Sequence, residues 1–130
     1  MNIAFLIGRI IFSGFWLMSA SDHFTKLDDI SQYTKAKGVP FPKLAVAGTG
    51  VLLLLGGASV LLGAYPAVGI ILLIVFMLGS TFPMHNFWTA NDPQMKQAHM
   101  IHFLKNMAIV GALLMLLAIP QPWPFSLASR

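Results

Sequence analysis

Residues 44–91 read LAVAGTGVLLLLGGASVLLGAYPAVGIILLIVFMLGSTFPMHNFWTAN, a run of 48 residues without one Asp, Glu, Lys or Arg. Soluble domains carry roughly a quarter charged residues, whereas this 130-residue chain carries 9% and is 57% hydrophobic. A body of this size cannot keep so much uncharged surface away from water, so its surroundings have to be lipid. The run therefore predicts an integral membrane protein, and the length allows one domain over residues 1–130.

A helix needs about 20 apolar residues to cross the hydrocarbon core of a bilayer. Four segments meet that length, at residues 3–20, 44–62, 66–82 and 99–119. Backbone groups in lipid must be satisfied within the segment, so each span is predicted to be helical. No segment shows the alternation of a membrane barrel. The predicted fold is all-α, a four-helix transmembrane bundle.

The turn at Gly63-Ala64-Tyr65-Pro66 predicts that the two middle spans form an antiparallel hairpin. Four spans place both termini on one side, called here the terminal side, and the loops at 21–43 and 83–98 on the other, called the loop side. Five of the six lysines and all four aspartates fall in the loop-side segments. The positive charges favour the loop side as cytoplasmic, in a bacterial or archaeal cytoplasmic membrane.

The first loop has helical signals of its own. Asp28 or Asp29 can cap a short helix that Gly38 would stop, and such a helix would lie in the interface plane. Aromatic side chains near the ends of spans usually anchor the protein at the membrane–water interface. Four side chains are expected to do so: Tyr65, Phe87, Trp88 and Trp123.

Arg9 lies about two turns inside the first span, where a charge is expensive and points to a function. One interpretation is that its side chain extends to the lipid headgroups on the terminal side. The other is that it anchors an anionic headgroup or a polar ligand inside the bundle. Its position within the apolar run also argues against a cleaved signal peptide.

A polar patch is predicted at the loop side. On a helix, His99, His102 and Asn106 project within about 60° of one another, with Lys105 beside them. The first and third spans end in polar residues at the same level, and we expect Asp22 to position Lys105. The candidate ligand-binding residues are Asp22, His85, Asn86, His102, Lys105 and Asn106.

Three interpretations of this patch stay open. The histidines can form local hydrogen bonds in a wet interface, or they can donate to a quinone or a lipid-like molecule. A third interpretation is a metal or haem site with His85, His99 and His102 as ligands. The chain has no Cys and no Glu, so thiolate and paired-glutamate mechanisms lack their residues. No basic stripe with interleaved aromatics is present, which argues against nucleic acid.

Several short motifs together resemble the DoxX family. They follow one another along the whole chain: Arg9 with Phe15 and Lys26, Lys37-Gly38-Val39-Pro40, Gly56-Gly57, His85-Asn86-Phe87-Trp88, Phe103-Leu104-Lys105-Asn106 and Pro122-Trp123-Pro124-Phe125-Ser126-Leu127. The resemblance implies a small four-helix integral membrane protein. Some members of the family are named as subunits of a thiosulfate:quinone oxidoreductase, others as membrane parts of oxidative-stress assemblies.

The chain departs from the family pattern at two positions. Several relatives carry a Glu in the second span where this chain has Leu53, which puts carboxylate-dependent chemistry in doubt. Position 102, often Asn before the Phe-Leu-Lys-Asn motif, is a histidine here and enriches the loop-side patch in that residue.

Three functions follow as expectations. The first is a membrane subunit of a quinone-linked redox system, not an enzyme on its own, which receives electrons from a partner protein. The alternative is a non-catalytic lipid-binding, assembly or structural protein. A small transporter fits less well, because its site would lie near the bilayer midplane beside broken helices. Membrane lipid, a redox partner protein and a second copy of the chain are the expected partners.

Overall fold

The computed structural model describes residues 2–126, and in that part of the chain the regular elements are all helices. They are α1 (Asn2–Thr25), α2 (Leu27–Ala36), α3 (Pro42–Leu62), α4 (Pro66–Met84), a 3-10 turn η1 (Phe87–Thr89) and α5 (Pro93–Leu117). Four helices (α1, α3, α4 and α5) are long and apolar enough to cross a membrane, with a mean hydropathy of 1.8 to 2.3. The predicted all-α four-span fold is confirmed.

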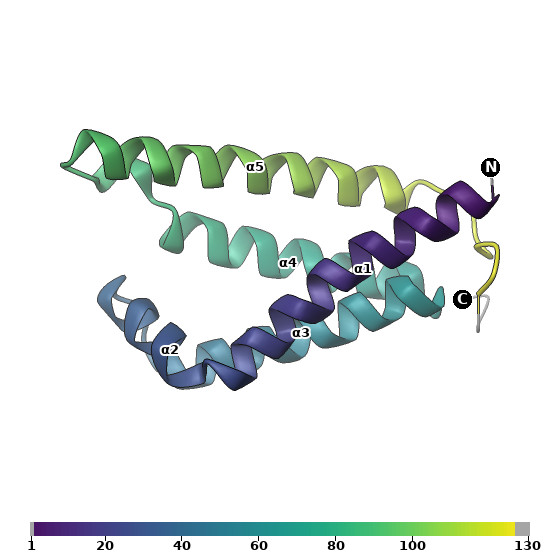
Figure 1. The fold of residues 1–130 in the computed structure, drawn as a ribbon, viewed down its shortest axis with the longest axis horizontal. Helices are drawn as coiled ribbons and strands as arrows, with labels where there is room; N and C mark the ends of the chain where they lie inside the picture. Colours follow the sequence, from purple (N-terminus) through teal and green to yellow (C-terminus); the bar gives the residue numbers. More distant parts are fainter. Residues whose placement is uncertain (1, 127–130) are drawn as a thin grey trace.

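The spanning helices lie side by side in an open arrangement (Figure 1). α3 packs against both α1 and α4, and α4 packs against α5. Figure 1 shows the start of α1 and the segment after α5 at one end, and α2 with η1 at the other. The predicted separation into a terminal side and a loop side is therefore present.

The α3–α4 hairpin follows the predicted turn. Gly63 and Tyr65 both adopt positive φ values, of 68° and 49°, between the end of α3 and Pro66 at the start of α4. The two helices approach closely because Gly56 and Gly69 have no side chains. A Cβ on Gly56 would lie 2.6 Å from the Leu73 side chain, and a Cβ on Gly69 would overlap the Ser59 side chain.

Two helices extend further than the hydropathy predicts. α1 runs on to Thr25, so the polar residues Asp22 and His23 belong to the helix itself. α5 starts at Pro93, six residues before the predicted position, because the Asp92 side chain accepts a hydrogen bond from the Gln94 N–H and caps the helix. Proline is favoured in the first turn after such a cap.

The predicted short helix in the first loop exists as α2, and Gly38 follows its end with a φ of 82°. The cap differs from the prediction. Lys26 takes the N-cap position without a side-chain cap, and both aspartates lie in the first turn, where the positive end of the helix favours carboxylates. Asp28 instead pairs with Lys43 at 3.3 Å.

The core lies where α1, α3 and α4 meet, around Trp16, Leu53 and Leu73. Leu53 is fully buried there. α5 is the least enclosed span, and among its residues only His99 and Leu113 are buried. A large part of the surface of α5 is therefore left for lipid.

Candidate functional site

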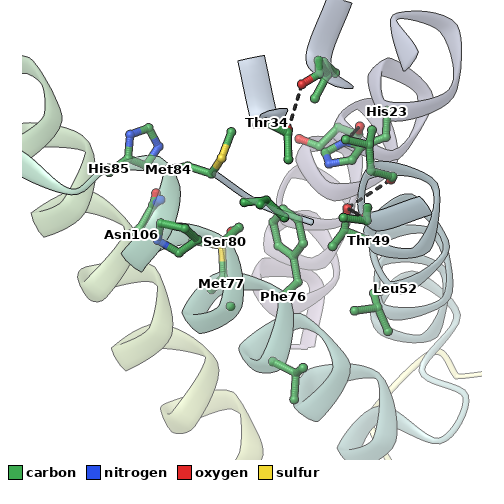
Figure 2. A pocket seen from close by; sticks show the side chains of 18 of the residues that line it. His23, Thr34, Thr49, Leu52, Phe76, Met77, Ser80, Met84, His85 and Asn106 are labelled. Carbon is green, nitrogen blue, oxygen red and sulfur yellow. Dashed lines mark hydrogen bonds between the residues drawn. The ribbon is translucent and has the colours of Figure 1, made fainter. Parts of the chain in front are cut away.

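A cavity of about 490 Å³ lies between the loop-side halves of α1, α3 and α4, beneath α2. We call it the loop-side cavity. Figure 2 shows it with polar side chains on two opposite walls and Phe76 between them. The polar residues that line it are Ser19, His23, Tyr33, Thr34, Thr49, Ser80, His85 and Asn106.

The first wall comes from α1 and α3 and carries His23 and Thr49. His23 Nδ1 lies 2.8 Å from the Ser19 carbonyl oxygen, and because a carbonyl only accepts, Nδ1 is the donor. The Thr49 hydroxyl lies 2.8 Å from the Ala45 carbonyl oxygen and donates to it. Both side chains therefore donate to backbone carbonyls of their own helices and not to groups in the cavity.

The second wall comes from α4 and α5. The Asn106 amide donates to the Thr81 hydroxyl at 3.0 Å, and Thr81 is fully buried. This bond fixes the orientation of the Asn106 amide and ties α5 to α4. His85 follows the last turn of α4, and its Nδ1 lies 3.4 Å from Nδ1 of His99.

The inner part of the cavity is apolar, with Trp16, Leu52 and Phe76 among its lining residues. Phe76 makes edge-to-face contacts with both Trp16 and His23, at 6.4 and 5.7 Å between ring centroids. Phe15, Val75 and Gly79 also line the cavity, yet they are exposed on the outer surfaces of α1 and α4. Because these residues lie within membrane spans, the cavity opens sideways toward lipid.

The helix α2 covers the loop-side end of the cavity. The Tyr33 hydroxyl donates to the Met84 carbonyl at 3.4 Å, and Lys37 Nζ donates to Asn86 Oδ1 at 3.0 Å. Partial burial raises the pKa of the Tyr33 phenol, which keeps its proton available for this bond. α2 was expected to lie in the interface plane, and these two contacts show that it also closes the bundle.

The structure separates the six residues of the predicted site. His85 and Asn106 line the cavity, whereas Asn86 is bonded to Lys37. His102 and Lys105 are exposed on α5, outside the residues that line the cavity.

The expected ion pair between Asp22 and Lys105 is not present among residues 2–126. Asp22 pairs with Lys26 at 3.8 Å, because residues four apart on one helix are neighbours. In addition, α1 and α5 diverge toward the loop side (Figure 1). Asp22 therefore does not position Lys105.

The three histidines proposed as metal ligands do lie together. The His85 ring stacks on His102 with centroids 5.0 Å apart, and the His85 and His99 centroids are 5.7 Å apart. In the described part of the chain, however, no three His, Asp or Glu side chains have an arrangement that could hold a metal ion. This geometry does not favour the metal interpretation over the other two.

Arg9 is buried, with 2% of its surface exposed. Its guanidinium donates to the carbonyls of Val60 and Leu61 at the end of α3, at 3.1 and 2.8 Å. It also donates to the carbonyls of Pro124 and Phe125. The side chain thus binds protein backbone, a third role beside the two predicted ones.

Trp123 is also buried rather than at the interface, with 2% exposed. It packs against Phe5 at 5.2 Å and against the Arg9 guanidinium at 5.5 Å. The predicted anchoring role is wrong for Trp123, because the segment after α5 folds back over Arg9. Tyr65 and Trp88 are exposed, at 63% and 52%, as anchors require.

Several cavity residues were not singled out from the sequence. Thr34, Thr49 and Phe76 look like ordinary helix residues when the chain is read in order. Thr49 carried the only available signal, since it is one of two hydroxyl residues in the apolar sequence of α3. His23 follows Asp22 directly after the first predicted span, but it is not in the candidate ligand-binding set.

The fold and the cavity define a small four-span membrane protein with space for one ligand at its loop side. The DoxX family model matches residues 4–86. Over 128 residues the chain is 30% identical to the inner membrane protein YphA of Escherichia coli strain K12, covering 98% of this chain and 90% of that protein. No solved structure gave a significant match. The chain belongs to the DoxX family, as its motifs suggested.

The family and the four apolar helices together establish the location. The chain is an integral protein of the cytoplasmic membrane, as predicted. The family match ends at His85-Asn86, so it includes part of the cavity wall but leaves out α5.

Proposed function

We propose that this protein is the membrane subunit of a quinone-linked redox system and that it binds the quinone in the loop-side cavity. The size and the lining of the cavity are the main support for this proposal. Its volume of about 490 Å³ falls among those of small-molecule sites, which are mostly apolar with a few placed polar groups. A quinone matches such a site, because its ring bears two polar oxygens and its tail is apolar.

The sideways opening supports a ligand that comes from the membrane. Phe15, Val75 and Gly79 border the cavity and face lipid, so a tail could leave the protein between α1 and α4. The head group would lie near the loop side, between His23 on one wall and His85 with Asn106 on the other. These three residues replace the broader patch as the proposed binding set.

The redox part of the proposal is supported by the family, since some of its members are named as subunits of a quinone oxidoreductase. The sequence carries no recognisable cofactor motif, so electrons would come from a partner protein. The alternative is a non-catalytic protein that holds an ordinary lipid in the same cavity. The two proposals differ in the molecule that occupies the cavity.

The first experiment is to extract the protein together with its native lipid and to identify the retained small molecules by mass spectrometry. We expect one quinone or quinol per chain. If only ordinary phospholipid is retained, the redox proposal is overturned and the lipid-binding alternative is supported.

A pair of glycine variants tests whether the quinone uses this cavity. Gly79→Phe should reduce the retained quinone several-fold, because a Cβ on Gly79 meets no atom within 4 Å and the new ring can fill the opening without disturbing the fold. Gly111→Phe on α5 is the matched control, since Gly111 has the same free space but lies away from the cavity. Equal retention in both variants would place the quinone elsewhere.

A further inference from the structure

We infer that the loop-side cavity selects a ligand that donates hydrogen bonds, and therefore binds the reduced quinol in preference to the oxidised quinone. The inference rests on the proposed function and adds to it the oxidation state that the protein binds. It follows from the hydrogen-bonding roles that the cavity side chains have left, since several of them have already used their proton in another bond.

Besides Tyr33, whose hydroxyl donates to the Met84 carbonyl at 3.4 Å, three cavity side chains have already donated their proton to backbone. The hydroxyls of Thr34 and Thr49 donate to the carbonyls of Ile30 and Ala45, each at 2.8 Å. His23 Nδ1 donates to the Ser19 carbonyl at 2.8 Å. A hydroxyl whose proton is used keeps lone pairs only, and a neutral imidazole with a proton on Nδ1 offers a lone pair on Nε2. All three side chains can therefore only accept from a ligand.

The remaining polar groups do not reverse this preference. Ser19 and Ser80 have hydroxyls, and Asn106 has an amide, so each can either donate or accept. His85 shares its Nδ1 contact with His99 and can present either role at Nε2. Trp16 also lines the cavity, and its indole N–H is a donor without a partner among residues 2–126, but its nitrogen is closed to a water-sized molecule in this structure.

A quinol and a quinone differ in the property that these walls select. The quinol has two hydroxyl donors at opposite ends of its ring, whereas the quinone has two carbonyls that only accept. A carbonyl facing Thr49 or His23 would bring two acceptors together, and both would lose water without gaining a bond. The wall formed by α1 and α3 therefore favours the quinol, and the wall formed by α4 and α5 tolerates either form.

The test compares three ligands with the same short alkyl tail: a quinol kept reduced, its quinone and the dimethyl ether of the quinol. Binding is measured by calorimetry to the full chain in phosphatidylcholine nanodiscs, whose headgroups have no N–H donor. We expect the quinol to bind about tenfold more tightly than the other two, the equivalent of one or two hydrogen bonds. A tenfold preference raises the midpoint potential of the bound pair by about 30 mV.

Thr49→Val removes one acceptor and should reduce the quinol preference by about two- to tenfold, while Thr49→Ser should keep it. Thr25→Val is the matched control, because Thr25 also donates to a backbone carbonyl, that of Ser21 at 2.9 Å, but does not line the cavity.

Three results would overturn the inference. They are tighter binding of the quinone, equal binding of the quinol and its dimethyl ether, and an unchanged preference in Thr49→Val. Loss of quinol binding when phosphatidylethanolamine supplies an ammonium donor instead would overturn the proposed function in favour of the lipid-binding alternative. If none of the three ligands binds, the proposed function itself has failed.

Discussion

Arg9 shows at the scale of one residue how a buried charge can be stabilised without lipid or ligand. The last carbonyls of a helix have no partner within the helix, and a cation is favoured at that end. Arg9 fills this role for α3 through Val60 and Leu61, and its remaining donors bind the carbonyls of Pro124 and Phe125. The side chain joins three parts of the chain that are far apart in sequence.

We expect Arg9→Met to lower the free energy of unfolding by about 3 kcal/mol or more, because it keeps the length of the side chain but leaves buried carbonyls without donors. Arg9→Lys should cost less, since an ammonium keeps the charge but lacks the planar fork. Unfolding in mixed micelles by SDS titration measures both changes. Gly8→Ala, at a neighbouring position with free space, should change little. A cost below about 0.5 kcal/mol for Arg9→Met would contradict this structural role.

The sequence alone singled out Arg9, because a charged side chain within an apolar span is costly to place in a membrane. Its partners could not be predicted. They are backbone carbonyls that carry no residue-specific signal, and two of them belong to a segment whose return over α1 no local pattern indicates. Trp123 was misassigned for the same reason, since its burial depends on that return.

At the scale of elements, the contact between α3 and α4 depends on glycines at which a side chain would not fit. We expect Gly69→Ala to destabilise the protein by about 1–3 kcal/mol, a typical cost of overpacking, because the new methyl group would overlap the Ser59 side chain. Ser59 cannot easily turn away, since its hydroxyl is bonded to the carbonyls of Ala64 and Tyr65. Gly111→Ala is the control, and equal stability of the two variants in SDS titration would show that close approach is not required.

The spans themselves were predictable because hydropathy is a local property. Their ends were less so. α5 begins at Pro93 because of the cap formed by Asp92, a signal that lies in polar sequence outside the apolar window. The loop-side cavity could be predicted only in part, as a polar level shared by several helices. Which residues face it depends on how α1 crosses α3 and on where α2 lies, and no single segment encodes either.

At the scale of the whole molecule, the two ends of the bundle differ in how they are closed. The terminal side is tied by Arg9 and packed around Trp123, both buried. The loop side contains the cavity, and α2 closes it with two polar contacts: Tyr33 to Met84 at 3.4 Å, and Lys37 to Asn86 at 3.0 Å. Tyr33 is 44% exposed, so its contact competes with water. We therefore expect α2 to open more readily than the spanning helices.

Hydrogen exchange measured by mass spectrometry in nanodiscs tests this difference. The double variant Tyr33→Phe with Lys37→Met should speed exchange in α2 by about tenfold, the effect expected when two exposed hydrogen bonds are lost. Exchange in α3 and α4 should stay slow, because their hydrogen bonds are protected inside the bundle. Lys35→Met is the matched control, since Lys35 is exposed on the same helix. Unchanged exchange in the double variant would mean that apolar packing against α3, rather than these contacts, holds α2 over the cavity.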